Sequence, residues 1–116
     1  MRGTVKIGSV EVGMLANAAS PVIYKQIFKE DFLKIMNELQ TAGNEVEGVN
    51  LFGKMGFVMA MQDSKRLEEL MSVSFNDYVK WLTQFEPNDL LMAAVDIATL
   101  YNKQETALSK EKKEEG

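Results

Sequence analysis

Apolar and polar residues alternate over residues 4–12, near the start of the chain. Valine and isoleucine occupy every second position on both sides of Gly8-Ser9. This alternation predicts two short strands, and a two-residue turn that begins with glycine favours a type II′ hairpin. Because a lone hairpin is only marginally stable in water, we expect it to pack on the rest of its own domain, with its edge still partly open to strand addition.

The apolar period then changes to that of a helix. Ser20 is expected to cap this helix with its hydroxyl, and Pro21 to take the first helical position, where its missing N–H costs nothing. The spacing predicts a helix over 21–40, with a break or kink near 29–31, where Asp31 could cap a second short helix. The apolar stripe of this region consists of Tyr24, Phe28, Phe32, Ile35, Met36 and Leu39.

Residues 41–50 show no such periodicity. They contain Gly43, Asn44 and Gly48 and are therefore predicted to form a loop. Asn50, at the end of this stretch, is expected to cap the helix that follows.

The helix after residue 50 is apolar on nearly all sides, because Phe57 and Met61 lie off the stripe formed by its other apolar residues. A helix of this kind either lies at the centre of a fold or is covered by another subunit, so it leaves room for self-association. Gly53 and Gly56 weaken it by about 1 kcal/mol each relative to alanine. Their missing side chains also permit a neighbouring helix to approach closely.

A polar continuation over 63–69 still allows Leu67 and Leu70 to face inwards. The segment 74–77 then has the form of a capping box, with an acid three residues after the serine hydroxyl. It predicts a third amphipathic helix, in which Trp81 lies beside the apolar stripe rather than in its middle. That stripe consists of Phe75, Tyr78, Val79, Leu82 and Phe85.

Pro87 is expected to end the third helix, because a residue before proline is pushed out of helical geometry. Asn88 or Asp89 opens a fourth helix that runs to Tyr101. Beyond it the apolar content collapses, and 104–116 is predicted to be a disordered charged tail or a fraying extension of the helix. The apolar residues of the fourth helix are Leu90, Leu91, Ala94, Val95, Ile97, Ala98 and Tyr101.

Together these patterns predict a mainly α protein. A short N-terminal β-hairpin is followed by a bundle of about four helices, in a single domain over 1–103. With 116 residues, the chain is long enough for one hydrophobic core. Its net charge of −4 and the lack of a basic cluster argue against a nucleic-acid partner.

Candidate chemistry is sparse. The chain contains neither cysteine nor histidine, which excludes disulfides, thiolate zinc sites and the commonest general base. The acidic residues are expected to lie on solvent-exposed helix faces, and the glycines do not form a phosphate-binding loop. We therefore expect no catalytic residue, metal or cofactor, and a protein that is not an enzyme. No apolar run is long enough for a membrane span and none resembles a signal peptide, so we expect a cytoplasmic protein with no membrane partner.

An apolar surplus is the better lead to function. Phe57, Met61 and Trp81 exceed what one stripe per helix requires. They either complete a small core or form an exposed patch that binds a partner, since large apolar patches on soluble proteins mark interfaces. The eight methionines fit both alternatives, because methionine fills irregular cores and adapts to varied partner surfaces.

In order and spacing, the chain resembles the tail assembly chaperones of long-tailed bacteriophages and prophages of Gram-positive hosts. One departure is at Lys29, because related sequences often have Phe-Gly-x-Asp where this chain has Phe-Lys-Glu-Asp. The similarity extends along nearly the whole chain. It rests on the segments 5–12, 20–28, 31–33, 52–61 and 75–85, and on the lysine-rich end after Tyr101.

The resemblance implies a non-enzymatic function. Proteins of this family bind the long, aggregation-prone tape measure protein, keep it soluble while the tail tube forms around it, and are absent from the finished virion. In many such phages a ribosomal frameshift makes an extended minor product whose extra domain recruits the major tail protein. Lys112-Lys113 is compatible with a slippery codon run at that point. The implied location is the cytoplasm of the host bacterium.

Under this interpretation several copies coat the tape measure protein through apolar helix faces, around Phe57, Met61 and Trp81, and acidic exteriors keep the assembly dispersed. Methionine side chains would tolerate varied partner sequences. The alternative from another class is a small helical adaptor or regulatory interaction module with a folded partner.

Overall fold

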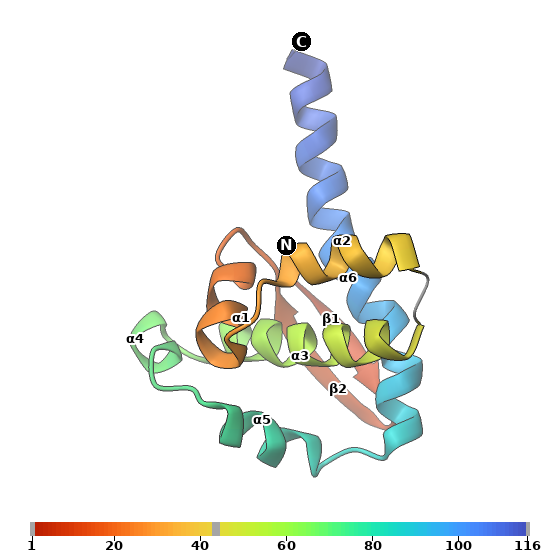
Figure 1. Cartoon of the computed structure of the whole chain (residues 1–116). Helices are drawn as coiled ribbons and strands as arrows, with labels where there is room; N and C mark the ends of the chain where they lie inside the picture. The colour runs from red at the N-terminus through yellow and green to blue at the C-terminus, as the bar shows by residue number, and fades with distance from the viewer. Residues whose placement is uncertain (1, 43–44, 116) are drawn as a thin grey trace.

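The computed structural model describes the backbone of residues 2–42 and 45–115, and the side chains of 2–39 and 48–102. Within this part of the chain it contains a two-stranded antiparallel sheet and six helices, so the predicted mainly α fold with an N-terminal hairpin is confirmed. Figure 1 shows the arrangement. The elements are β1 (Arg2–Ile7), β2 (Val10–Leu15), α1 (Ser20–Phe28), α2 (Phe32–Ala42), α3 (Glu45–Ser64), α4 (Leu67–Leu70), α5 (Phe75–Leu82) and α6 (Pro87–Glu115).

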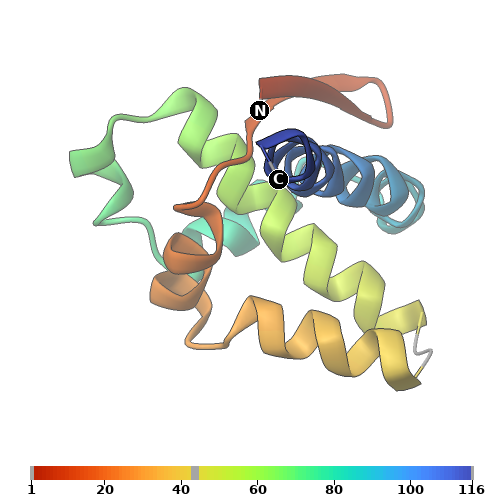
Figure 2. The same cartoon turned by 90° about the horizontal axis from the view of Figure 1, so that it is seen from above.

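The hairpin packs on its own domain. Ile7 pairs with Val10, so the turn is Gly8-Ser9, and Gly8 has the positive φ of 64° that the first position of a type II′ turn requires. Both strands extend further than the predicted 4–12. Figure 2 shows the hairpin lying over two helices, with β2 against α3 and β1 against α6. Its inward side chains Val5, Ile7 and Met14 are buried in the core.

The predicted break in the first helical region is confirmed. Lys29 has a φ of 59°, a left-handed conformation that ends α1, and its N–H donates to the carbonyl of Lys25 at 2.8 Å. Asp31 then caps α2, since its carboxylate accepts a hydrogen bond from the N–H of Lys34 at 3.1 Å. The chain changes direction between these two residues.

Ser20 does not cap α1, contrary to the prediction. It is the first residue of the helix and fully buried. Its hydroxyl accepts a hydrogen bond from the backbone N–H of Asn17 and donates one to the side-chain oxygen of Gln62. The cause is a tertiary contact. The hydroxyl of Ser20 donates to Gln62 of α3 and therefore does not cap the first turn of α1.

The prediction of a loop over 41–50 is wrong in its described parts. α2 continues to Ala42 and α3 begins at Glu45, so Gly48 is helical and Asn50 caps nothing; residues 43–44 lie outside the described residues. Intrinsic propensity is a weak guide here, because packing against neighbouring elements overrides it.

The all-round apolar α3 lies at the centre of the fold, as one of the two predicted alternatives has it. It packs against β2, α6, α1 and α2. Its glycines allow the close approach to α6: a Cβ on Gly56 would lie 2.7 Å from Cδ1 of Ile97, and one on Gly53 would lie 3.3 Å from Cδ2 of Leu90.

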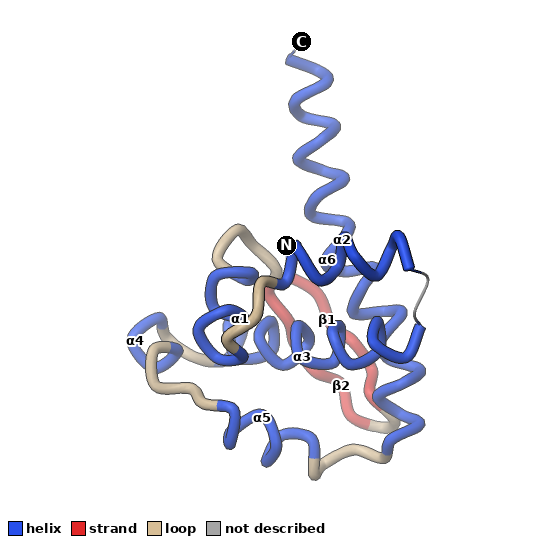
Figure 3. The backbone as a smooth tube through the Cα atoms, viewed as in Figure 1, coloured by secondary structure: helices blue, strands red, loops and turns tan. Residues whose placement is uncertain are grey.

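Short helices joined by loops connect α3 to α6 (Figure 3). α4 is a single turn in which Leu70 is buried, whereas Leu67 is exposed, so the prediction that both face inwards is half wrong. The capping box before α5 is confirmed, since the N–H of Ser74 donates to the carboxylate of Asp77 at 2.8 Å.

Two predictions about α5 and α6 need correction. Tyr78 and Trp81 are the buried residues of α5, whereas Phe75 and Val79 are exposed, so Trp81 lies on the buried face and not beside it. Pro87 begins α6 instead of ending α5, which already stops at Leu82. Proline fits the first helical position, where no N–H is needed.

The last part of α6 projects away from the body of the molecule (Figure 1). Its side chains beyond Asn102 lie outside the described part of the chain. The division into a domain over 1–103 and a disordered tail over 104–116 therefore stays a prediction.

Candidate partner-binding surface

Reaction chemistry finds no support in the described part of the chain. No three acidic residues gather there in a way that could hold a metal ion. Nor does any described helix combine the length and the apolar character that crossing a membrane requires.

Titratable groups do meet between α1 and α3, in a pocket of about 320 Å³. The hydroxyl of Tyr24 donates to Glu30 at 2.9 Å, and Nζ of Lys54 lies 3.2 Å from the same carboxylate and 5.5 Å from the ring centre of Phe28. Burial, and then the hydrogen bond to Glu30, raise the pKa of Tyr24 far above its usual value, so it keeps its proton. Because each of these groups has a partner, the cluster joins α1 to α3 and offers no free base or nucleophile.

The three residues predicted as a partner-binding patch do not form one. Phe57 is 1% exposed and Trp81 is 8% exposed, with ring centres 5.5 Å apart, and Met61 packs half-buried against the same core. α5 lies over this side of α3 and covers it. The structure therefore corresponds to the other alternative, in which these side chains complete a small core.

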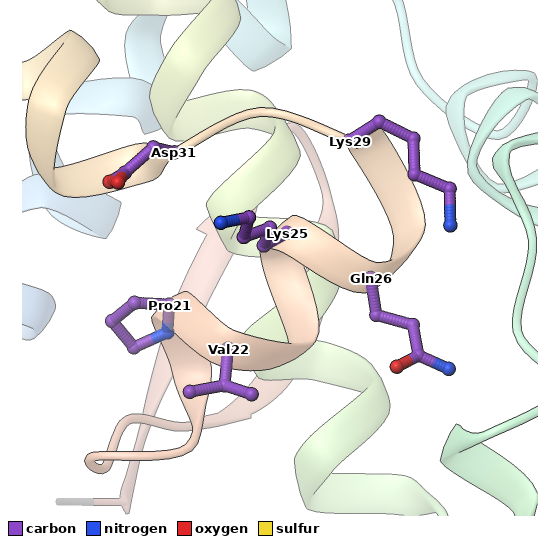
Figure 4. A pocket seen from close by; sticks show the side chains of 6 residues that line it. All are labelled: Pro21, Val22, Lys25, Gln26, Lys29 and Asp31. Carbon is purple, nitrogen blue, oxygen red and sulfur yellow. The ribbon is translucent and has the colours of Figure 1, made fainter.

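The outer face of α1 is a second candidate surface, a shallow depression of about 620 Å³. Figure 4 shows its side chains on α1 and on the segment that follows it, pointing in different directions. They do not converge on one point. The lining residues are Pro21, Val22, Lys25, Gln26, Lys29 and Asp31.

An apolar groove between α3 and α6 is the stronger candidate, with a volume of about 560 Å³. Every lining side chain is apolar or absent. Val49 and Phe52 come from α3 and Leu91 and Val95 from α6, while the small residues between them leave the space open. The full lining, called the α3–α6 groove below, is Gly48, Val49, Phe52, Leu91, Ala94, Val95 and Ala98.

The apolar side chains of α6 at this groove are unusually exposed to solvent. Leu91 is 49% exposed, Val95 is 68% exposed, and the adjacent Met92 is 75% exposed. Exposed apolar side chains that gather beside a groove mark a binding surface more often than scattered ones do. The α3–α6 groove is therefore the candidate site.

From the sequence, Leu91 and Val95 were counted among the apolar residues of the fourth helix without distinguishing buried from exposed ones, and Met92 was not considered. A signal was present: Ile97 and Tyr101 are buried with Ala93 and Ala94 on one face, and this face already accounts for the contact of α6 with the body. Leu91, Met92 and Val95 lie about a quarter turn or more away from the middle of this face. They exceed what one buried face needs.

Comparisons of this chain with the known protein families, with curated proteins and with solved structures find no match.

Proposed function

We propose that this protein is a tail assembly chaperone of a long-tailed bacteriophage or prophage. It binds the tape measure protein in the cytoplasm of the host and keeps it soluble while the tail tube forms. The α3–α6 groove supports this proposal best, because it is an exposed apolar trough between two helices. The resemblance of the sequence to that family supplies the identity of the partner.

The mechanism follows from the groove. The resemblance implies a partner that is long and aggregation-prone, and we propose that helices of this partner expose apolar stripes until the tail tube encloses them. A groove between two helices accepts such a stripe in the helix-in-groove mode of recognition. Several copies along the partner would cover successive stripes, and their net charge of −4 each would keep the complexes apart. An extended frameshift product would add the contact with the major tail protein.

Co-expression with the cognate tape measure protein tests the proposal. The wild-type chain should raise the soluble fraction of that protein after centrifugation, whereas Val95→Asp should abolish the increase, because it places a charge in the groove. Val22→Asp on α1 is the matched control, since Val22 is 69% exposed and lies outside the groove. If the tape measure protein stays equally insoluble with and without the wild-type chain, the chaperone function is rejected.

A further inference from the structure

The α3–α6 groove also indicates the chemistry of its occupant. We propose that it binds an amphipathic α-helix whose apolar stripe is flanked by lysine and arginine. This inference takes the groove from the proposed function as the binding site, but it is independent of which protein supplies the helix.

The lining of the groove favours a helix over an extended segment. None of its seven residues has a polar side-chain atom. An extended peptide would therefore leave its backbone N–H and C=O groups without partners in the groove, which is costly. A helix satisfies these groups internally and presents side chains only.

The dimensions fit the same occupant. From Leu91 to Ala98 the α6 wall covers eight residues, and the seven rises of 1.5 Å between them give a length of about 10 Å. Two turns of a docked helix cover this length and place apolar side chains at i, i+3 or i+4, and i+7 in the groove. Gly48, beside which a Cβ would meet nothing within 4 Å, leaves room for the largest of them.

The charges around the groove select the flanks of the occupant. No lysine or arginine occurs in 41–53 or 81–102, the two stretches of chain that supply the lining. The nearest basic residue of α3, Lys54, is paired with Glu30. Of the acidic residues of these stretches whose side chains are described, Glu86 and Asp96 are exposed, whereas Asp89 lies against Gly8 of the hairpin turn. Basic flanks would therefore be attracted and acidic flanks repelled.

A second copy of this chain is a poorer occupant. Two copies meeting through the exposed face of α6 would bring the exposed carboxylate of Asp96 from each copy into the same interface. The exposed apolar side chains of that face are Leu91, Met92 and Val95. Stable interfaces use about 20–30 residues on each side, so these three side chains alone would make a small interface between two copies.

Two synthetic peptides test the inference with the full chain. Both have about 18 residues, roughly five turns, and the same leucine and alanine stripe; one carries lysine on its flanks and the other glutamate. Fluorescence anisotropy of the labelled peptides measures binding. The lysine peptide should bind at least roughly tenfold more tightly, and this ratio should shrink between about 0.05 M and 0.3 M salt as the charges are screened.

Two substitutions of one residue show whether the peptide occupies the groove. A Cβ at residue 48 would meet nothing within 4 Å, and leucine suits a helix better than glycine. In Gly48→Leu the fold should therefore persist, while the added side chain takes up space in the groove and lowers binding of the lysine peptide at least roughly tenfold. Gly48→Ala is the control and should bind like the wild type.

Equal affinity for both peptides, no binding of the lysine peptide, or unchanged binding by Gly48→Leu would each overturn the inference. Because the peptides contain no tape measure sequence, the two proposals fail separately. If the protein discriminates between the peptides but the tape measure protein stays insoluble, only the chaperone function is rejected. If the tape measure protein becomes soluble but the two peptides bind equally well, only the preference for basic helices is rejected.

Discussion

At the scale of single residues, a small polar network joins the start of α1 and the loop before it to the central helix. The hydroxyl of Ser20 donates to Oε1 of Gln62 at 2.6 Å, and Nε2 of Gln62 donates to Oδ1 of Asn17 at 2.9 Å. Ser20 and Gln62 are both buried, yet no buried side-chain nitrogen or oxygen of the described residues lacks a partner. The network is therefore fully satisfied, and removing one member leaves another unpaired in the core.

Ser20→Ala should lower the free energy of unfolding by about 1–3 kcal/mol, since it strands the side-chain oxygen of Gln62. Gln62→Leu should cost a similar amount. The double variant should cost less than the sum of the two by at least about 0.5 kcal/mol, because the partners are removed together. Urea unfolding of the four proteins measures this cycle. Strict additivity would contradict the network.

Tyr78 makes the stability of the fold sensitive to alkaline pH. Burial raises its pKa to about 12, against about 10 in an unfolded chain. Below pH 10 both states hold the proton and the stability is complete. Between pH 10 and 12 only the unfolded state releases it, so the fold loses up to about 1.4 kcal/mol per pH unit. Urea unfolding between pH 9 and 12 should show a shallower loss for Tyr78→Phe than for the wild type. Equal slopes would show that Tyr78 titrates normally.

The sequence could not show which apolar side chains are left outside. Phe57 and Trp81 lie off their predicted stripes, and the surplus was real, but α5 covers both of them. Val95, which fits a core stripe by spacing, is exposed because no element covers that side of α6. Burial of a side chain depends on where other elements lie, and periodicity along one helix does not contain this information.

At the scale of elements, the turn between α1 and α2 shows what local sequence determines well. Asp31 caps α2 as predicted, through a hydrogen bond between residues three apart. The backbone of Lys29 has the left-handed geometry that glycine adopts most readily, so the turn forms here although the residue is a lysine. The departure in sequence leaves the break in place.

Lys29→Gly should raise the free energy of unfolding by about 1 kcal/mol, because a residue with a Cβ is strained at a φ of 59°. Lys29→Ala removes the same side chain and keeps the strain, so it should show no such gain. Urea unfolding of both variants separates the two contributions. A gain for alanine equal to that for glycine would mean that loss of the lysine, and not relief of the backbone, stabilises the protein.

Longer-range features of the elements were less predictable. The start of α3 at Glu45 was missed because glycine and asparagine between residues 41 and 50 are typical of loops. Gly48 is nevertheless helical, in a helix that packs on several neighbours along its length. The sequence predicted that some helix could approach α3 closely at Gly56. It could not predict that this helix would be α6 or that the contacting residue would be Ile97.

At the scale of the whole molecule, one arrangement produces both the core and the groove. α3 crosses the centre, and the hairpin lies over α3 and α6 together (Figure 2). Near the start of α3, small residues of both helices line the groove, and it stays open to solvent among the described residues. The candidate site is therefore the part of the contact between α3 and α6 that stays open to solvent.

This open contact should make association of the protein depend on pH. The net charge of −4 at pH 7 vanishes near the pI of about 4.9, so the repulsion that keeps copies apart is lost as the pH falls. Sedimentation velocity should show larger species at pH 5 than at pH 7. Val95→Ser should reduce this association, because it removes an apolar side chain from the groove without changing the charge. Val22→Ser is the matched control, since the two valines are 68% and 69% exposed, and it should associate like the wild type. Equal association of both variants would assign the effect to charge alone and leave the groove without a part in it.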